Sequence, residues 1–228
     1  AVLPDPDGLR VGSGGATLNA LRYVCTQEGT FAGKRILCIH SGGDSKRVPQ
    51  YSACGKLFSP VPRELPNGRR STLFDEFIIG MSGVPSRIRD GMLVLSGDVL
   101  LLFNPLQIDF YGKGAAALSI KEPAEIGKNH GVYRVDGEGN VGGFLHKKTV
   151  EQLQSLGASD DQGNVDIDTG AVIFDSEMLQ ALYQLVDTKE KFAAYVNERT
   201  RLSFYADFLY PLASDSTLEQ YYNCLLYT

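Results

Sequence analysis

The amino-acid sequence predicts an α/β fold in which helices flank a mixed, mostly parallel sheet. Short apolar segments at 35–40 and 92–96 alternate with segments of helical periodicity, and each apolar segment runs into glycine. Neither segment shows the polar alternation of a half-exposed strand. Such runs are typical of strands buried on both faces of a parallel sheet. The alternation of strands with helices then predicts helical layers over that sheet.

In the first half of the chain, the segment at 16–25 has apolar residues at near-helical spacing after a glycine turn, which predicts a helix beginning near Ala16. A strand follows at 35–40. The segment at 71–80 predicts a second helix, because a Ser or Thr cap precedes acidic residues in its first turn. The strand at 92–96 ends at Gly97.

The second half is richer in strands. We expect them at 115–120, 131–135, 141–146 and 166–174, the last of these returning to the sheet. The Gly-rich turn at 136–140 predicts a hairpin between the second and third of these strands. Helices are expected at 150–156, 177–186 and 190–200.

Composition narrows the class of function. The 228 residues carry a net charge of -5, which argues against non-specific binding to nucleic acid and favours a small-molecule partner. No apolar run approaches the roughly 18 residues of a membrane span, and the N-terminus lacks the features of a signal peptide. The four cysteines show no metal-binding spacing, so we expect reduced thiols and a cytoplasmic protein. The abrupt ends suggest a piece of a longer chain.

A possible phosphate site follows the strand at 35–40. Gly42 and Gly43 present backbone amides where a nucleotide can approach closely. Arg47 and Lys56 come soon after, and such cations can hold a triphosphate and neutralise a leaving pyrophosphate. A solvated basic loop is the alternative interpretation. The Walker A pattern and the dinucleotide fingerprint are both incomplete in this chain.

Asp98 follows the strand at 92–96, at the strand end where ligands bind in sheets of this class. Its carboxylate suits a hard cation such as Mg²⁺, which takes carboxylate and phosphate oxygens together. A turn-forming role is the alternative. Asp166, Asp168 and Asp207 are candidates for a second carboxylate, and sequence spacing does not choose among them.

The segment HSGGDSKRVPQYSACGKLF at 40–58, with RVGSGGATL at 10–18, resembles the fucose-1-phosphate guanylyltransferase family. It is most similar to the N-terminal part of the bifunctional L-fucokinase/GDP-L-fucose pyrophosphorylases. The resemblance continues in GVYRVD at 131–136, FLHK at 144–147, DTGAVIF at 168–174 and SFYADFL at 203–209. It implies that residues 1–228 form a GT-A-like (Rossmann-like) nucleotidyltransferase domain. This pyrophosphorylase domain would be truncated at its C-terminus, without the β-helical and kinase domains that follow in the family.

The resemblance also implies an activity, in which GTP and β-L-fucose-1-phosphate give GDP-L-fucose and pyrophosphate with Mg²⁺ as cofactor. A kinase domain would be covalently linked in the full-length protein. The implied residues are Arg47 and Lys56 for catalysis, Gly14, Gly15, Thr17, Gly42 and Gly43 for the nucleotide, Lys147 and Asp168 for the substrate, and Asp98 and Asp207 for the metal.

Two alternatives of other classes stay open. The first is a non-catalytic nucleotide-binding or regulatory domain of a sugar kinase. The second is an NAD-dependent oxidoreductase. The missing dinucleotide fingerprint disfavours the oxidoreductase. Asp98 together with Lys56 and Arg47 favours the enzyme over the regulatory domain, because a domain that only binds nucleotide does not need a metal carboxylate.

Overall fold

A computed structural model describes residues 1–41, 49–51, 53, 55–108, 110, 112–219 and 221. The chain forms two compact units. The first contains residues 1–29, 117–169 and 181–228, and the second contains residues 30–116 and 170–180. Strand β8 (Asn164–Phe174) begins in the first unit and ends in the second.

The second unit is built on a parallel strand pair. β1 (Arg35–His40) pairs in parallel with β4 (Gly91–Ser96), and β4 pairs antiparallel with the last residues of β8. β4 is buried along nearly its whole length, as predicted. β1 is not, because it lies first in the strand order and its Leu37 is 40% exposed. The apolar run thus identifies the strand but not its position in the sheet.

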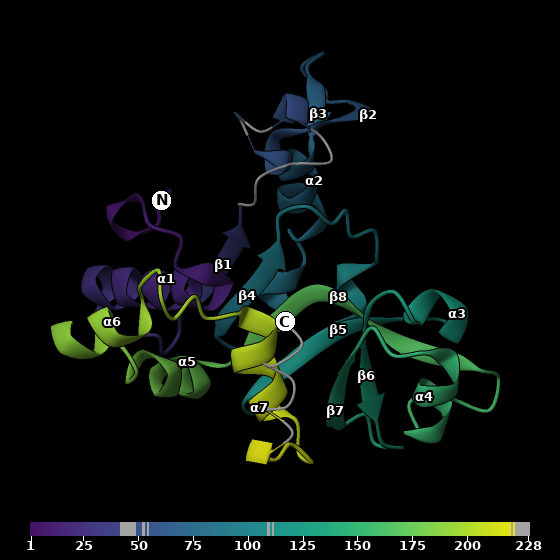
Figure 1. The fold of residues 1–228 in the computed structure, drawn as a ribbon. Coiled ribbons are helices and arrows are strands. Elements are labelled where there is room, and N and C mark those ends of the chain that lie inside the picture. Colours follow the sequence, from purple (N-terminus) through teal and green to yellow (C-terminus); the bar gives the residue numbers. More distant parts are fainter. Residues whose placement is uncertain are drawn as a thin grey trace. The chain divides into compact units, whose positions relative to one another are not determined.

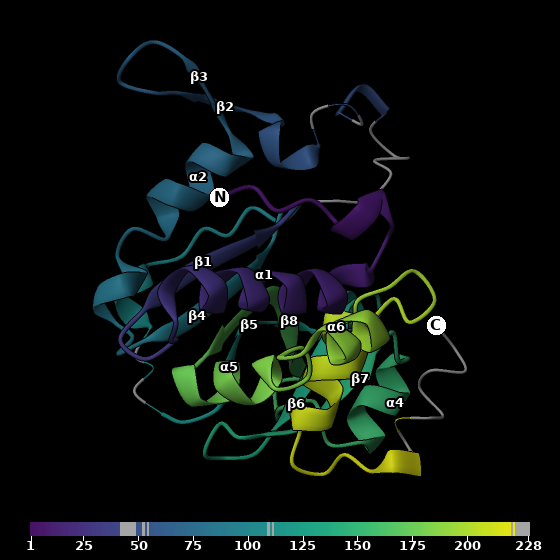
Figure 2. The same cartoon turned by 90° about the vertical axis from the view of Figure 1, so that its left-hand side faces the viewer.

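A hairpin and a helix complete the second unit. β2 (Pro60–Glu64) and β3 (Arg70–Thr72) pair antiparallel and lead into α2 (Leu73–Gly80), and both ribbon views show the three elements together (Figures 1 and 2). Prolines in β2 hide this strand from a sequence pattern, because proline is atypical within strands. Thr72 forms a capping box with Asp75, which confirms the predicted Ser or Thr cap.

In the first unit, β6 (Gly131–Val135) and β7 (Val141–His146) form the predicted hairpin. β6 also pairs antiparallel with the start of β8, and β5 (Ala115–Pro123) pairs with β8. A small apolar core is formed by Ala124, Val132, Leu153, Ala158, Val165 and Ile167. Leu153 comes from α4 (Val150–Ser155), which Figure 1 shows beside α3 (Ala124–Gly127) and near this hairpin.

The remaining helices are short, apart from α1. They are α1 (Gly12–Glu28), α3 (Ala124–Gly127), α4 (Val150–Ser155), α5 (Ser176–Tyr183), α6 (Lys189–Tyr195) and α7 (Tyr210–Leu212), with the π-helical turn η6 (Phe204–Leu209) before α7. α1 begins earlier than predicted and ends at Glu28. The next residue, Gly29, has a left-handed backbone, which is a common way for a helix to stop. The helices predicted at 177–186 and 190–200 are confirmed with shorter bounds.

The predicted α/β class is confirmed, but the prediction of a mostly parallel sheet is wrong. Among the described strands with a printed register, β1 and β4 are parallel, whereas β4 with β8, β6 with β8 and β6 with β7 are antiparallel. An apolar run reports burial and carries no information on strand direction. The predicted strand at 166–174 does return to the sheet, but it runs against β4. The GT-A-like topology stays a prediction.

The described cysteines agree with the expected reduced state. Cys25 and Cys38 are free thiols, and burial raises the pKa of Cys38 to about 11. Cys54 and Cys224 lie outside the described residues. Within the described part of the chain, none of the helices has the length and apolar character needed to span a membrane.

The start of β4 provides a test of the second unit. Gly91 has φ +121°, and a Cβ atom there would lie 2.0 Å from the carbonyl oxygen of Phe174. We expect Gly91→Ala to lower the free energy of unfolding by about 3 kcal/mol, because strain and overlap combine. Urea unfolding measures this loss. Gly137→Ala is the control, since a Cβ there meets nothing within 4 Å. Equal stability of the two variants would contradict the backbone geometry at Gly91.

Candidate functional site

The candidate site in the second unit lies where β1 and β4 end. Their parallel register places His40 opposite Ser96. The next residue, Gly97, donates its N–H to the carbonyl oxygen of His40 at 2.8 Å. A Cβ on Gly97 would lie 2.2 Å from that oxygen, so a side chain does not fit there. This close approach of the two backbones fixes the position of Asp98, the next residue in the chain.

Asp98 accepts two hydrogen bonds. Ser96 Oγ donates to Oδ1 at 2.7 Å, and Lys56 Nζ donates to Oδ2 at 3.0 Å. Partial burial raises the pKa of Asp98, but the bonds from Ser96 and Lys56 and the charge of Lys56 outweigh it and hold this pKa below its usual value. Asp98 is therefore a carboxylate at neutral pH. We call Lys56, Ser96, Gly97 and Asp98 the strand-end cluster.

Lys56 reaches Asp98 from a short 3-10 turn, η3 (Lys56–Phe58). The turn follows Gly55, whose φ of +77° is a conformation that favours glycine. A Cβ on Gly55 would lie 3.3 Å from Ser41 Oγ, so the backbone before Lys56 passes close to the end of β1. The structure thus pairs Lys56 with the strand-end carboxylate, and the predicted roles of the two residues stay predictions.

The first turn of α2 holds the other side of η3. Leu73 donates its N–H to the carbonyl oxygen of Ser59 at 3.0 Å. The rings of Phe58 and Phe74 lie with centroids 5.8 Å apart, a favourable distance for an aromatic pair. These contacts place Lys56 relative to the start of α2.

Gly42, Gly43 and Arg47 lie outside the described residues, and their predicted roles stay predictions. Among the residues that the structure does describe, no group of three or more His, Cys, Asp or Glu is arranged to hold a metal ion. The single exposed carboxylate of Asp98 still fits Mg²⁺, which proteins often bind through one or two carboxylates together with substrate phosphates. A closed metal cage is not needed for this kind of site.

Gly14, Gly15 and Thr17 lie in the first turns of α1 in the first unit, and all three are buried. Gly14 donates its N–H to Leu202 O at 2.8 Å, and a Cβ on Gly14 would lie 2.9 Å from the Leu202 side chain. Thr17 Oγ1 donates to Ser13 O at 2.9 Å. The glycines therefore permit close packing of α1, and their predicted role in nucleotide binding stays a prediction.

Asp168 accepts a hydrogen bond from the Tyr133 hydroxyl at 2.8 Å, across β8 and β6. Burial and the charge of Asp168 raise the pKa of Tyr133 far above its usual value, so the phenol remains a donor. Sequence spacing did not single out Tyr133. Asp166, another candidate carboxylate, is buried and forms an ion pair with Lys121 at 3.0 Å.

Asp207 lies in η6, and both of its carboxylate oxygens accept hydrogen bonds. The backbone N–H of Ser203 donates to Oδ2 at 2.6 Å, and the Tyr221 hydroxyl donates to Oδ1. These bonds hold the start of the π-helical turn. The predicted role of Asp207 as a metal ligand stays a prediction.

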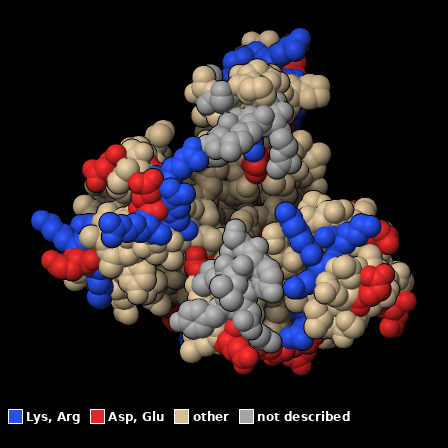
Figure 3. Space-filling view, in the orientation of Figure 1, with Lys and Arg blue, Asp and Glu red and all other residues tan. Residues whose placement is uncertain are grey.

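Lys147 lines a cavity of about 350 Å³ in the first unit. The residues around it are Glu125, Lys128, Asn129, Lys147, Lys148, Thr149, Val150 and Glu151. Lys147 has φ +49°, an uncommon conformation for a residue with a side chain. Figure 3 shows Lys and Arg side chains gathered over the region of α3 and α4. The cavity thus offers cations beside a few carboxylates.

The pKa of His146, the residue before Lys147, responds to the positive charges beside the cavity. Its pKa lies below the usual value because of partial burial and then because of the positive charges of Lys147 and Lys148. A positive potential opposes protonation of an imidazole. Lys147 and Lys148 thus make their side of the cavity positive, while Glu125 and Glu151 also line it.

This potential can be measured directly. We expect Lys148→Gln to raise the pKa of His146, because one of the two charges that lower it is removed. An NMR titration of the imidazole gives the pKa in each variant. Lys128→Gln is the matched control: Lys128 lines the same cavity, pairs with Glu125 at 2.7 Å and is not a cause of the His146 shift. A His146 pKa unchanged by Lys148→Gln would contradict this account of the charge.

Comparison with known proteins identifies similar chains. Residues 29–225 match the fucose pyrophosphorylase domain family. The chain is 30% identical over 205 residues to a bifunctional fucokinase/GDP-fucose pyrophosphorylase of Arabidopsis thaliana. This match covers 75% of this chain and 19% of that protein. It is 31% identical over 173 residues to the fucose-1-phosphate guanylyltransferase of Mus musculus, covering 69% of this chain and 28% of that protein.

The human fucose-1-phosphate guanylyltransferase is 28% identical over 257 residues, and the match covers 96% of this chain. The chain spans 40% of that protein, so each of these relatives is much longer than the 228 residues described by the sequence.

Proposed function

The chain belongs to the fucose pyrophosphorylase domain family, and on this premise we propose that it is a fucose-1-phosphate guanylyltransferase. It joins GTP and β-L-fucose-1-phosphate to give GDP-L-fucose and pyrophosphate. The observation that carries the proposal is the contact of Lys56 with Asp98 at 3.0 Å, beyond the ends of two parallel strands. A cation and a carboxylate at such a strand end suit a metal-bound nucleotide.

The reaction makes one bond and breaks one. An oxygen of the sugar phosphate forms a bond to the α-phosphorus of GTP. The bond from that phosphorus to the oxygen bridging to the β-phosphorus breaks, and its electron pair leaves with pyrophosphate. The attacking oxygen is already anionic, so no strong base is required. Positioning of the two substrates and neutralisation of charge are what the protein must supply.

Within this proposal, Lys56 and Arg47 bind the triphosphate and stabilise the charge that develops on pyrophosphate. Gly42 and Gly43 donate backbone N–H groups to the nucleotide. Asp98 would hold Mg²⁺, which supplies Lewis-acid stabilisation of phosphoryl charge when bound. Ser96 keeps the Asp98 carboxylate oriented through its 2.7 Å hydrogen bond.

Roles are proposed for residues of the first unit as well, each taken by itself. Lys147, on the electropositive edge of its cavity, binds the phosphate of the sugar phosphate. Asp168 accepts a hydrogen bond from a sugar hydroxyl while Tyr133 fixes its orientation. Gly14, Gly15 and Thr17, in the first turns of α1, contribute to nucleotide binding in this proposal.

We also propose that this domain works in the cytoplasm, in a longer polypeptide that carries a kinase domain. The support for the linked kinase is the match to relatives from Arabidopsis thaliana and Bacteroides fragilis, whose names include both fucokinase and guanylyltransferase or pyrophosphorylase. A kinase acting on the free sugar would supply the sugar phosphate that this domain consumes.

Substitution of Lys56 tests the assignment. We expect Lys56→Ala to lower the rate of pyrophosphate release by at least about 10³-fold, because the protein loses the positive charge that neutralises the phosphates during transfer. The thermal unfolding midpoint should change little. Lys113→Ala is the control, because Lys113 is in the same unit and its side chain is 81% exposed. Turnover of Lys56→Ala equal to that of Lys113→Ala would remove Lys56 from the mechanism.

Substrate identity needs a separate measurement. Several nucleoside triphosphates are combined with several sugar-1-phosphates, and pyrophosphate release is measured for each pair. GTP with fucose-1-phosphate is expected to be the fastest pair. Binding of GTP without pyrophosphate release from any pair would favour the alternative of a regulatory nucleotide-binding domain.

A further inference from the structure

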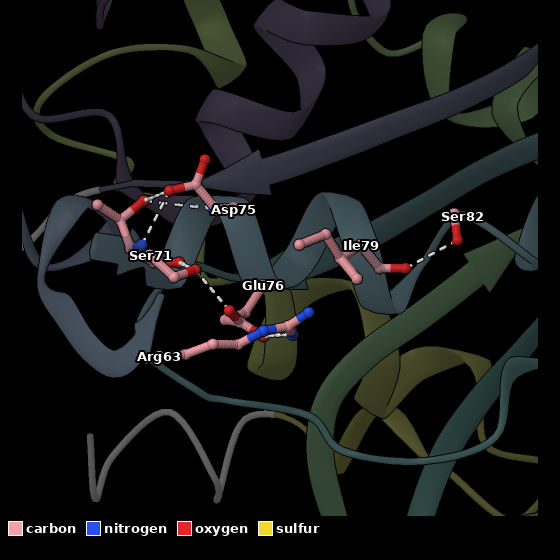
Figure 4. Close-up of polar contacts among 7 residues, drawn as sticks. Arg63, Ser71, Asp75, Glu76, Ile79 and Ser82 are labelled. Atoms are coloured by element: carbon pink, nitrogen blue, oxygen red, sulfur yellow. Dashed lines mark hydrogen bonds and ion pairs between the residues drawn. The ribbon is translucent and has the colours of Figure 1, made fainter. Parts of the chain in front are cut away.

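Glu76 of α2 is a charged residue on the inner face of a helix. It is 9% exposed, and Ser71, which contacts it, is fully buried. Ser71 Oγ donates to Glu76 Oε1 at 2.5 Å, and Arg63 Nη1 donates to Oε2 at 2.7 Å (Figure 4). One carboxylate therefore joins β2, β3 and α2. We call Arg63, Ser71 and Glu76 the buried anchor.

Apolar packing alone does not explain this arrangement. Phe74, Ile78 and Ile79 are all more than a third exposed, so much of the apolar surface of α2 lies outside the core. Arg63 is half exposed, so its pair with Glu76 is only partly buried. Such a pair contributes little net stability, but it can select one geometry. Hydrogen bonds from two strands constrain the rotation of α2 in a way that non-directional apolar contacts do not.

The orientation of α2 matters because its first turn contacts η3. Leu73 N–H donates to Ser59 O, and Phe74 packs on Phe58. Lys56 is the first residue of η3, and its Nζ lies 3.0 Å from Asp98. A rotation or shift of α2 would therefore move Lys56 relative to Asp98.

We propose that Glu76 is a positioning residue which, with Ser71 and Arg63, holds α2 in the orientation that keeps Lys56 in place at Asp98. This inference rests on the proposed function only in giving Lys56 a role in the reaction. Glu76 itself contacts neither substrate nor metal in this scheme. It acts through the helix, which links the hairpin to the turn carrying the lysine.

Two serine substitutions at opposite ends of α2 form a matched pair. Ser71→Ala removes the hydrogen bond to Glu76, and Ser82→Ala removes one from Ser82 Oγ to Ile79 O at 2.8 Å (Figure 4). We expect Ser71→Ala to lower kcat for pyrophosphate release about tenfold with the KM for sugar phosphate unchanged, because small displacements of a catalytic group reduce rate strongly. Ser82→Ala should keep the wild-type kcat. Glu76→Gln should behave as Ser71→Ala.

A second readout does not depend on turnover. The rate at which a water-soluble acetylating reagent modifies Lys56 is measured by mass spectrometry, with Lys113 of the same chain as the internal reference. Ser71→Ala should raise the Lys56 rate at least twofold as the contact with Asp98 loosens, while the Lys113 rate stays constant. Ser82→Ala should change neither rate.

The outcomes separate the two proposals. A Ser71→Ala variant that is destabilised but keeps the wild-type kcat and Lys56 acetylation rate overturns the positioning role and leaves Glu76 a purely structural residue. A wild-type protein without pyrophosphate release overturns the proposed function, while the acetylation rates still decide whether the buried anchor positions Lys56. If Glu76→Gln fails to fold, Ser71→Ala decides the question.

Discussion

The parallel pairing of β1 with β4 is the constraint on which the candidate site depends. It brings two strand ends to one edge, with His40 opposite Ser96. At that edge the chain crosses so closely that Gly97 has no space for a side chain. Asp98 is thereby delivered to a fixed position beside Lys56. The rest of the sheet can be antiparallel without affecting this geometry. An incorrect prediction of strand direction therefore coexists with a close contact between Asp98 and Lys56.

The sequence-based predictions are accurate where a local pattern in the sequence marks the element, and they fail where the outcome depends on distant residues. Strands β1, β6 and β7 were found with their observed bounds because apolar runs and a Gly-rich turn mark them clearly. Strand direction was not predictable, because it depends on partners distant in the chain. The β2–β3 hairpin was missed because prolines interrupt its pattern.

The site residues divide in the same way. Asp98 and Lys56 were predicted from chemistry at a strand end and from a family resemblance, and the structure places them in contact. Ser96 and Glu76 were not singled out, because their roles come from contacts with the Asp98 carboxylate and with Ser71. Asp207 shows the converse limit: an acidic residue within a family motif gives no sign that Ser203 and Tyr221 occupy its oxygens.

The Lys56–Asp98 ion pair and the Ser71–Glu76 hydrogen bond of the second unit differ in burial, and they therefore respond differently to salt. Lys56 and Asp98 have side chains that are 27% and 45% exposed, so dissolved ions screen their attraction. The hydrogen bond of Ser71 to Glu76 lies in the interior, where mobile ions have little access. Rising ionic strength therefore weakens the outer contact while the inner one persists. The lysine becomes freer to exchange partners while the hydrogen bond of Ser71 to Glu76 still holds the helix behind it.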